Sequence, residues 1–200
     1  MNLSAQNPIG EKSEEKTFFL TSNYLRKLKG KVGEFVWKRD GTVDLPERKG
    51  FTKLVVEADA ELAAEIKVLY LRNPVTTVED AQKLVRIKTL NCTSCGFTVV
   101  PKWIEKIPAL KEVHLTGNDL RELPSSLMNM PTLKTVYASN NRSLRTISVG
   151  RNLNFLSISN CNISSLPHDL FHHRLAVVKV NGNKGELRIE RNVYADIPML

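Results

Sequence analysis

Hydrophobic residues recur along the middle of the chain at a fixed interval of 23 residues. One passage places them at Ile87, Leu90, Cys92, Cys95, Phe97, Val100, Pro101, Ile104 and Ile107, and the next repeats the order at Leu110, Val113, Leu115, Asn118, Leu120, Leu123, Pro124, Leu127 and Met130. A repeat of this length is typical of a solenoid, because each unit buries its hydrophobic face only against its neighbours. The pattern therefore predicts a stack of similar units with one continuous core.

The same register continues on both sides of these two passages. Further units begin at Leu133, Leu153 and Leu175 and, less completely, upstream at Ile66 and Phe51. In the Ile66 unit, Pro74 stands at the position where the others carry Asn or Cys. Leu153 follows Leu133 by only 20 residues, which predicts that the segment returning to the next strand is clipped in that unit.

Within each unit, the residue types predict a strand, a turn and a return. The residues around Val113 alternate between outward and inward positions, as in a β-strand with one buried face. The Asn or Cys position turns the chain out of the strand, and a buried amide there must bond backbone groups of neighbouring units. The Leu-Pro segment that follows predicts a short helical or 3₁₀ return.

Between Ile87 and Val180 the motif L-x-x-L-x-L-x-x-N/C-x-L-x-x-L-P-x-x-L resembles the leucine-rich-repeat family, in its intracellular type with units of 20–23 residues. The resemblance implies an α/β fold. It is a curved solenoid with parallel β-strands on the concave face and short helical or 3₁₀ returns on the convex face. It also implies a non-catalytic protein–protein interaction module, a scaffold or adaptor, although fold alone does not assign function.

The chain outside the repeats predicts two caps, because an open solenoid end exposes core residues and strand edges. Residues 1–16 are polar and predict a disordered tail. We expect residues 17–65 to form a small α+β cap at the N-terminal end, residues 66–184 the repeats, and residues 185–200 a C-terminal cap. A separate binding module in residues 17–65 is the alternative.

Two local patterns suggest how the N-terminal cap is built. Thr21 or Ser22 can cap a short helix that Gly30 ends. Asp40-Gly41, between two hydrophobic runs within residues 34–45, predicts a hairpin, since this pair tolerates the positive φ of a tight turn.

Composition and cysteine placement bear on where the protein works. The chain is 42% hydrophobic with a formal net charge of +8, and its polar N-terminus predicts neither a signal peptide nor a membrane anchor. Cys92, Cys95 and Cys161 fall at inward repeat positions, so we expect free thiols in a reducing, cytoplasmic compartment. A bacterial effector that targets a host protein and is secreted without a cleavable signal peptide is the alternative.

Few residues in the chain have the spacing of a reactive or metal-binding site. Cys92 and Cys95 have the spacing of a redox pair or half a zinc site, but no second pair completes four ligands. His168 and His172 are suited to one helical face but lack a third ligand. Phosphate loops, nucleophile elbows and paired acids do not occur in the sequence. We therefore expect no enzymatic activity, no metal and no cofactor.

Outward strand positions carry the side chains that the core does not use. Among them we predict six partner-binding residues: Tyr70, Arg72, His114, Tyr137, Phe155 and Lys179. Large aromatic anchors among small polar residues are typical of protein-binding surfaces. The alternative is that these are isolated exposed aromatics, which are ordinary on protein surfaces.

Lysine occupies the position before the strand in four consecutive units, at Lys67, Lys88, Lys111 and Lys134, which we call the lysine rim. Neighbouring parallel strands lie about 4.8 Å apart, so these ammonium groups should repel one another. An acidic protein partner would offset that repulsion, and we predict such a partner rather than a membrane. The alternatives are a solvated edge that resists aggregation and binding to RNA or DNA, where phosphate contacts come chiefly from Lys and Arg.

Overall fold

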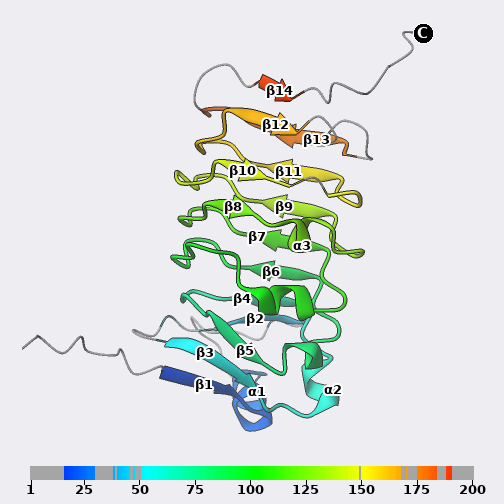
Figure 1. Ribbon diagram of the computed structural model, residues 1–200. Coiled ribbons are helices and arrows are strands. Elements are labelled where there is room, and N and C mark those ends of the chain that lie inside the picture. Colours follow the sequence, from blue (N-terminus) through cyan, green and yellow to red (C-terminus); the bar gives the residue numbers. More distant parts are fainter. Residues whose placement is uncertain are drawn as a thin grey trace, which may run out of the picture.

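In the computed structural model, the chain winds into an elongated stack of coils, and each coil contributes a strand to one long sheet (Figure 1). The structure describes residues 16–29, 38, 40–45, 47, 51–148, 150–167, 170, 175–183 and 188–190. All strand pairs among these residues are parallel. Parallel pairing of successive units is the solenoid that the 23-residue period predicts.

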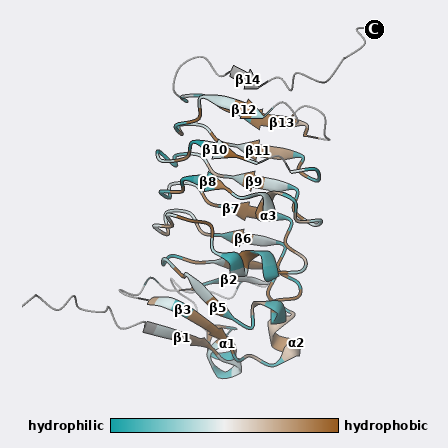
Figure 2. Cartoon of the chain, viewed as in Figure 1, coloured by the Kyte–Doolittle hydropathy of each residue, from teal (hydrophilic) through white to brown (hydrophobic). Residues whose placement is uncertain are grey.

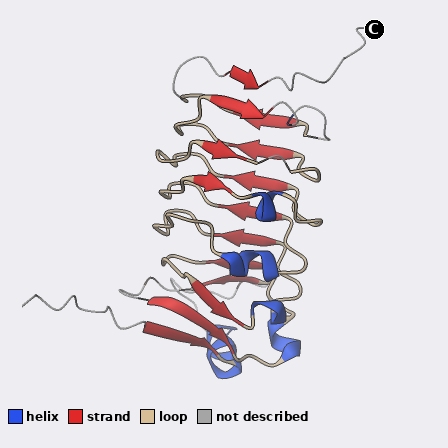
Figure 3. Ribbon diagram, viewed as in Figure 1, coloured by secondary structure: helices blue, strands red, loops and turns tan. Residues whose placement is uncertain are grey.

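The long sheet, which we call the main sheet, has seven strands in the order β13-β11-β9-β7-β6-β4-β2 (Figures 1 and 3). Its strands are β2 (Thr42–Asp44), β4 (Val68–Tyr70), β6 (Thr89–Asn91), β7 (Glu112–His114), β9 (Thr135–Tyr137), β11 (Phe155–Ser157) and β13 (Val177–Lys179). Equivalent residues of successive units pair directly, as Val113 does with Val136. The register read from the sequence is therefore the register of the sheet.

Shorter sheets and helices make up the other side of the stack. A sheet in the order β1-β3-β5 contains β1 (Lys16–Leu20), β3 (Phe51–Val56) and β5 (Thr77–Glu79), while β8 (Glu122–Leu123) pairs with β10 (Thr146–Ile147) and β12 (Ser165–Pro167) with β14 (Arg188–Glu190). The helices are α1 (Ser22–Lys29), α2 (Ala60–Ala63), α3 (Ser125–Met128) and the 3₁₀ helices η1 (Ala81–Lys83) and η2 (Lys102–Lys106). The helices η2 and α3 are the short returns expected after Pro101 and Pro124.

Hydrophobic side chains from every coil meet between the sheets in one core. The central residue of each interior strand of the main sheet, such as Leu90, Val113 and Val136, is fully buried, whereas its two neighbours are half-buried, except for Ser157 on β11, which is buried. In Figure 2, hydrophobic residues colour parts of strands such as β7 and β11, and hydrophilic residues colour many turns. Burial of this apolar surface is the main stabilising contribution to the stack.

Asparagine side chains bond successive coils together at the turn after the strand. The amide nitrogen of Asn118 donates to the carbonyls of Cys92 at 2.9 Å and Leu115 at 2.8 Å, and its oxygen accepts from the Phe97 amide at 3.0 Å. Asn141 and Asn183 repeat this three-bond arrangement one and three coils further on. Each buried amide is satisfied, as the sequence pattern requires.

Cysteine occupies the same place in two other units. The Cys95 thiol donates to the Leu71 carbonyl at 3.1 Å, and the Cys161 thiol donates to the Ala138 carbonyl at 3.4 Å. Both thiols are buried and free. Each makes a carbonyl contact of the kind an asparagine makes, so the expected packing role of these two cysteines is confirmed.

The N-terminal region continues the stack through both of its sheets. Strand β2 pairs in parallel with β4, and β3 pairs with β5, so strands on both sides of residue 65 share sheets. The predicted helix is confirmed as α1, where the Thr21 hydroxyl accepts from the Tyr24 amide at 3.0 Å. Residues 1–15, 30–37 and 191–200 lie outside the described residues, so the predicted tail and the first arm of the hairpin are not described.

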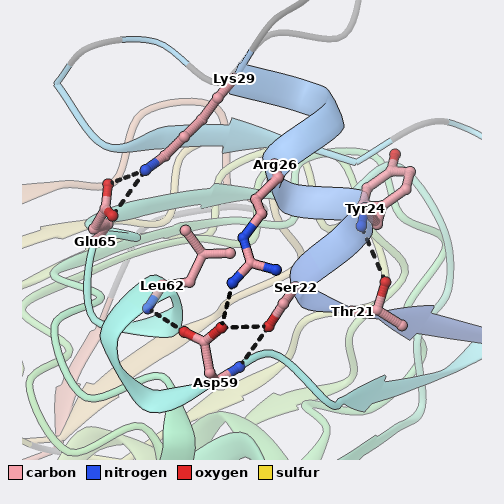
Figure 4. Close-up of polar contacts among 8 residues, drawn as sticks. All are labelled: Thr21, Ser22, Tyr24, Arg26, Lys29, Asp59, Leu62 and Glu65. Atoms are coloured by element: carbon pink, nitrogen blue, oxygen red, sulfur yellow. Dashed lines mark hydrogen bonds and ion pairs between the residues drawn. The ribbon is translucent and has the colours of Figure 1, made fainter.

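Polar contacts bind α1 to α2 (Figure 4). The Asp59 carboxylate accepts from the Leu62 amide at 2.9 Å and so caps α2, and it also accepts from the Ser22 hydroxyl at 2.8 Å. The Arg26 guanidinium donates to the same carboxylate at 3.1 Å. A second ion pair joins Lys29 to Glu65 at 2.6 Å. One carboxylate therefore connects two helices that lie far apart in the sequence.

Two details of the sequence register are wrong in this region. Pro74 is exposed while Asn73 is 3% exposed, so the Ile66 unit closes one residue earlier than expected. Phe51, Leu54 and Val56 lie in β3, in the sheet opposite the main sheet, and not in a main-sheet strand. The strand that precedes β4 in the main sheet is β2, whose short hydrophobic pattern around Val43 gave a weaker signal.

The clipped return between Leu133 and Leu153 requires a glycine. A Cβ atom at Gly150 would lie 2.2 Å from the carbonyl oxygen of Met128 and 3.0 Å from the side chain of Leu153. Because Gly150 has no side chain, the shortened segment can pass close to the preceding coil. The 20-residue unit therefore stays in register with its neighbours.

Candidate protein-binding face

The outer face of the main sheet presents the predicted partner-binding residues. In each strand the residues on either side of the buried centre project outward, since side chains alternate along a strand. His114 and Tyr137 sit in register on β7 and β9, and Phe155 lies on the next strand, β11. The repeat positions in the sequence therefore predict that these side chains lie on the outer face of the main sheet, and they do.

Three rings form a continuous cluster on this face, which we call the aromatic cluster: His114, Tyr137 and Phe155. The His114 and Tyr137 rings stack with centroids 4.4 Å apart and planes 18° apart. The Tyr137 and Phe155 centroids are 5.0 Å apart, with the rings tilted by 45°. The Lys179 ammonium lies 5.6 Å from the Phe155 centroid, within cation–π range. Four of the six predicted residues thus meet in one patch.

Polar neighbours hold this patch in place. The Glu112 carboxylate lies 2.5 Å from Nε2 of His114, which fixes the imidazole beside Tyr137. Beyond Tyr137, the hydroxyls of Ser139 and Ser157 are 2.8 Å apart, and the Ser159 amide donates to the Ser139 hydroxyl at 3.1 Å. The aromatic cluster therefore sits on a face whose small polar groups already bond one another.

Tyr70 and Arg72 do not join the aromatic cluster. Strand β6 lies between β4, which carries Tyr70, and β7. The Arg72 guanidinium binds the Asp44 carboxylate through two nitrogens, at 2.9 Å and 2.6 Å, and this pairing raises the pKa of Arg72. Arg72 is thus already paired with β2. The sequence did not predict this ion pair, because its pattern around Asp44 indicates a hairpin and not a strand of the main sheet.

The lysine rim is a run of neighbours along the main sheet. The amide of Lys88 donates to the carbonyl of Lys67, that of Lys111 to Lys88, and that of Lys134 to Lys111, each at 2.8 Å. Lys67, Lys88 and Lys111 are exposed, whereas Lys134 is half-buried and its ammonium donates to the Asn152 carbonyl at 3.2 Å. The backbone therefore fixes the four residues side by side, with three freely presented charges.

The described residues hold no group of three or more His, Cys, Asp or Glu side chains suited to a metal ion. Burial raises the pKa of the Cys92 thiol well above its usual range, and a hydrogen bond from Cys92 lowers the pKa of Cys95. Both side chains are at most 3% exposed, so their contacts are those of core residues. His168 and His172 lie outside the described residues.

Over the part of the chain that the structure describes, helices are too short or too polar to cross a lipid bilayer. The longest of them, α1, has eight residues, and its last turn carries Arg26, Lys27 and Lys29.

One comparison with known proteins agrees with the repeat pattern of the sequence. A family model described as Leucine Rich Repeat matches residues 152–173. No curated protein matches the chain in sequence. A solved structure titled as the functional domain of InlJ from Listeria monocytogenes, which includes a cysteine ladder, is similar to this chain with 16% identity and a TM-score of 0.46. That similarity covers 67% of this chain and 35% of the InlJ chain. The segment that the family model matches is one coil of the stack, and it contains the strand β11 and the turn at Cys161.

Proposed function

We propose that this protein is a non-catalytic scaffold or adaptor that binds another protein through the outer face of its main sheet. Solenoids of this family generally serve as protein-interaction modules, because stacked coils build an extended surface. The observation that carries the proposal is the aromatic cluster flanked by Lys179. Adjacent aromatic anchors on a rigid sheet are the side chains that dominate protein interfaces.

An acidic partner surface fits the charges around this cluster. Lys67, Lys88 and Lys111 line one side of the main sheet with exposed ammonium groups. Adjacent like charges repel, and carboxylates from a partner would offset this repulsion while steering the encounter. We therefore propose that acidic residues of the partner contact the lysine rim while an apolar group contacts the aromatic cluster.

Nucleic acid fits the aromatic cluster less well. Single-stranded nucleic acid binds by stacking its bases on exposed aromatic faces. Here the faces of His114 and Tyr137 stack on each other at 4.4 Å, which leaves no space for a base between them. The Glu112 carboxylate beside His114 would also repel a phosphate backbone. These contacts support a protein partner over an RNA or DNA partner.

Site-specific photo-crosslinking tests the proposal. A benzophenone amino acid replaces Thr135, which is half-buried on the outer face of β9, or Gln82, which is exposed in η1 on the opposite side. We expect the Thr135 position alone to give one defined cross-linked protein, joined through a peptide rich in Asp and Glu. Adding Tyr137→Ala and Phe155→Ala should abolish that product. Equal cross-linking from both positions would contradict the proposal.

A further inference from the structure

A second polar site lies away from the main sheet, beside β8 and β10. Arg121, Ser143 and Arg145 line a cavity of about 290 Å³. The Arg145 amide donates to the Arg121 carbonyl at 3.1 Å, so the two arginines stand on adjacent coils at equivalent positions. Both are exposed. The fold therefore places two arginines along one pocket.

Within the described part of the chain, these two guanidinium groups have no ion-pair partner. Among the described residues, no carboxylate lies within ion-pair distance of Arg121 or Arg145. The third lining residue, Ser143, donates a hydrogen bond from its hydroxyl to the Asp119 carboxylate. The backbone hydrogen bond between Arg145 and Arg121 keeps the two residues on adjacent coils, and neither guanidinium is neutralised by an ion pair among the described residues.

The pocket lies beside an irregularity of the repeat. One residue, Asp119, separates Asn118 from Leu120, whereas two residues, Arg142 and Ser143, separate Asn141 from Leu144. The extra residue lies in this turn, and the Ser143 hydroxyl bonds the turn to Asp119 of the preceding coil. Insertions in solenoids fall in loops on one face, which is often a binding face.

We propose that this pocket binds a small phosphate monoester. A guanidinium presents a planar fork of donors that matches two phosphate oxygens, and a monoester carries a charge of about −1.5 to −2 at pH 7. Two forks from adjacent coils suit a group with three charged oxygens better than a carboxylate with two. Small-molecule sites have volumes of about 300–1,000 Å³. A cavity of about 290 Å³ therefore accommodates a phosphate with a small attached group.

The surroundings of the pocket favour a small ligand over a membrane surface. Asp119 and Glu122 are both exposed beside the two arginines. An extended anionic lipid surface would meet these carboxylates together with the arginines and be repelled by them, whereas a single phosphate can contact the arginines alone. The phosphate therefore comes from a soluble ligand.

Calorimetric titration of the full chain at low salt tests this site with three probes: glycerol 2-phosphate, inorganic phosphate and acetate. We expect the monoester to bind at least about tenfold more tightly than acetate, because charge-assisted forks favour the dianion. Arg121→Ala and Arg145→Ala should each weaken monoester binding about tenfold or more. Arg121→Lys should also weaken it, because a lysine keeps the charge but loses the fork.

Two further variants distinguish this pocket from general attraction to a basic protein. Arg86→Ala removes an exposed arginine outside the pocket and should leave the affinity unchanged. Asp119→Asn removes the competing negative charge and should strengthen binding severalfold. The proposal is overturned if acetate binds as tightly as the monoester, or if Arg86→Ala weakens binding as much as Arg121→Ala does. Sedimentation with phosphatidylserine vesicles that depends on Arg121, without monoester binding, would overturn it in favour of a membrane surface.

Discussion

The imidazole of His114 stacks on the ring of Tyr137, with centroids 4.4 Å apart and planes that differ by 18°. The two residues lie 23 positions apart in the sequence and are direct partners in the register of β7 and β9. In a parallel solenoid, residues at equivalent positions of successive units therefore lie side by side and can contact each other. Side chains that lie far apart in the sequence therefore form one surface, and the protein-binding hypothesis depends on this arrangement.

Replacement of Tyr137 by Ala should cost about 2 kcal/mol of unfolding free energy, because it removes both the aromatic pairing, worth about 0.5–1.5 kcal/mol, and the apolar area of a half-buried ring. The coils should remain folded, since the core residue of this strand is Val136, which is fully buried. Urea unfolding measures the change, with Thr135→Ala as the control on the same strand. A loss above about 4 kcal/mol would place Tyr137 in the core instead, where truncating an aromatic costs that much.

Residue spacing predicted the repeats because each position has one mechanical role. Asn118 and Asn141 were expected to bond neighbouring coils, and each does so through two hydrogen bonds, with a further bond to a carbonyl three residues earlier in its own coil. The outward positions of His114, Tyr137 and Phe155 follow from the two-residue period of a strand. The side of the sheet on which these residues lie was therefore predictable.

Contacts that depend on side-chain conformation or on weak units could not be read from the sequence. The spacing of residues in the sequence does not show that the Phe155 ring contacts the Tyr137 ring, although Phe155 pairs with Thr135 in the sheet. It also does not show that Tyr70 lies apart from this cluster. Arg72 is paired with Asp44 because β2 belongs to the main sheet, and the short run at Val43 is too brief to carry a 23-residue signal. The pocket beside Arg121 likewise lies next to one extra residue in a loop, and the repeat pattern does not predict that residue.

Replacement of Asn141 by Ala should destabilise the fold by about 3 kcal/mol or more. The change leaves the carbonyls of Leu115 and Ala138 and the amide of Leu120 without their partner in a buried site, and each unsatisfied group costs about 1–3 kcal/mol. Chemical denaturation measures the loss.

Asn141→Cys should be milder than Asn141→Ala, because Cys161 occupies the equivalent place and bonds the Ala138 carbonyl. Asn129→Ala, at an exposed asparagine, should change stability by less than about 0.5 kcal/mol. Equal effects of the alanine changes at 141 and 129 would show that the asparagine contacts do not stabilise the stack.

Asp59 should make the junction of α1 and α2 sensitive to acid. The amide of Leu62, followed by the hydroxyl of Ser22, holds the pKa of Asp59 below its usual value, and Arg26 adds to this effect. Because the folded-state pKa is lower than that of the unfolded chain, the stabilisation is present at neutral pH. It is lost as the pH falls from about 5 through the folded-state pKa.

Melting temperatures of the native chain and of Asp59→Ala, measured between pH 7 and pH 2, test this dependence. The difference between them should be largest at neutral pH and should shrink in acid. Asp59→Asn keeps a capping side chain without a titrating group, so it should retain part of the stability and lose the pH dependence. A difference between the native chain and Asp59→Ala that is the same at all pH values would contradict the assigned role of the carboxylate.

The three cysteines should resist thiol reagents until the chain unfolds. Cys92 and Cys95 are at most 3% exposed and Cys161 is 7% exposed, and burial raises the pKa of Cys92 and of Cys161. Thiolate is the reactive form, so reaction requires both exposure and deprotonation. A colorimetric thiol titration should detect almost no reaction in buffer and all three thiols in denaturant. Rapid labelling of Cys95 in the native protein would instead support the redox hypothesis for this pair.

Charge reversal of the lysine rim should separate binding from stability. In the variant Lys67→Glu, Lys88→Glu and Lys111→Glu, three neighbouring carboxylates repel one another about as strongly as the ammonium groups do. The unfolding free energy should therefore change by less than about 1 kcal/mol. Lys134 is left unchanged because its ammonium bonds the Asn152 carbonyl.

An acidic partner should lose nearly all of its affinity for this glutamate variant, since three attractive charges become repulsive. The matched variant with arginine at the same three positions should keep binding, and undiminished binding by the glutamate variant would remove the rim from the interface.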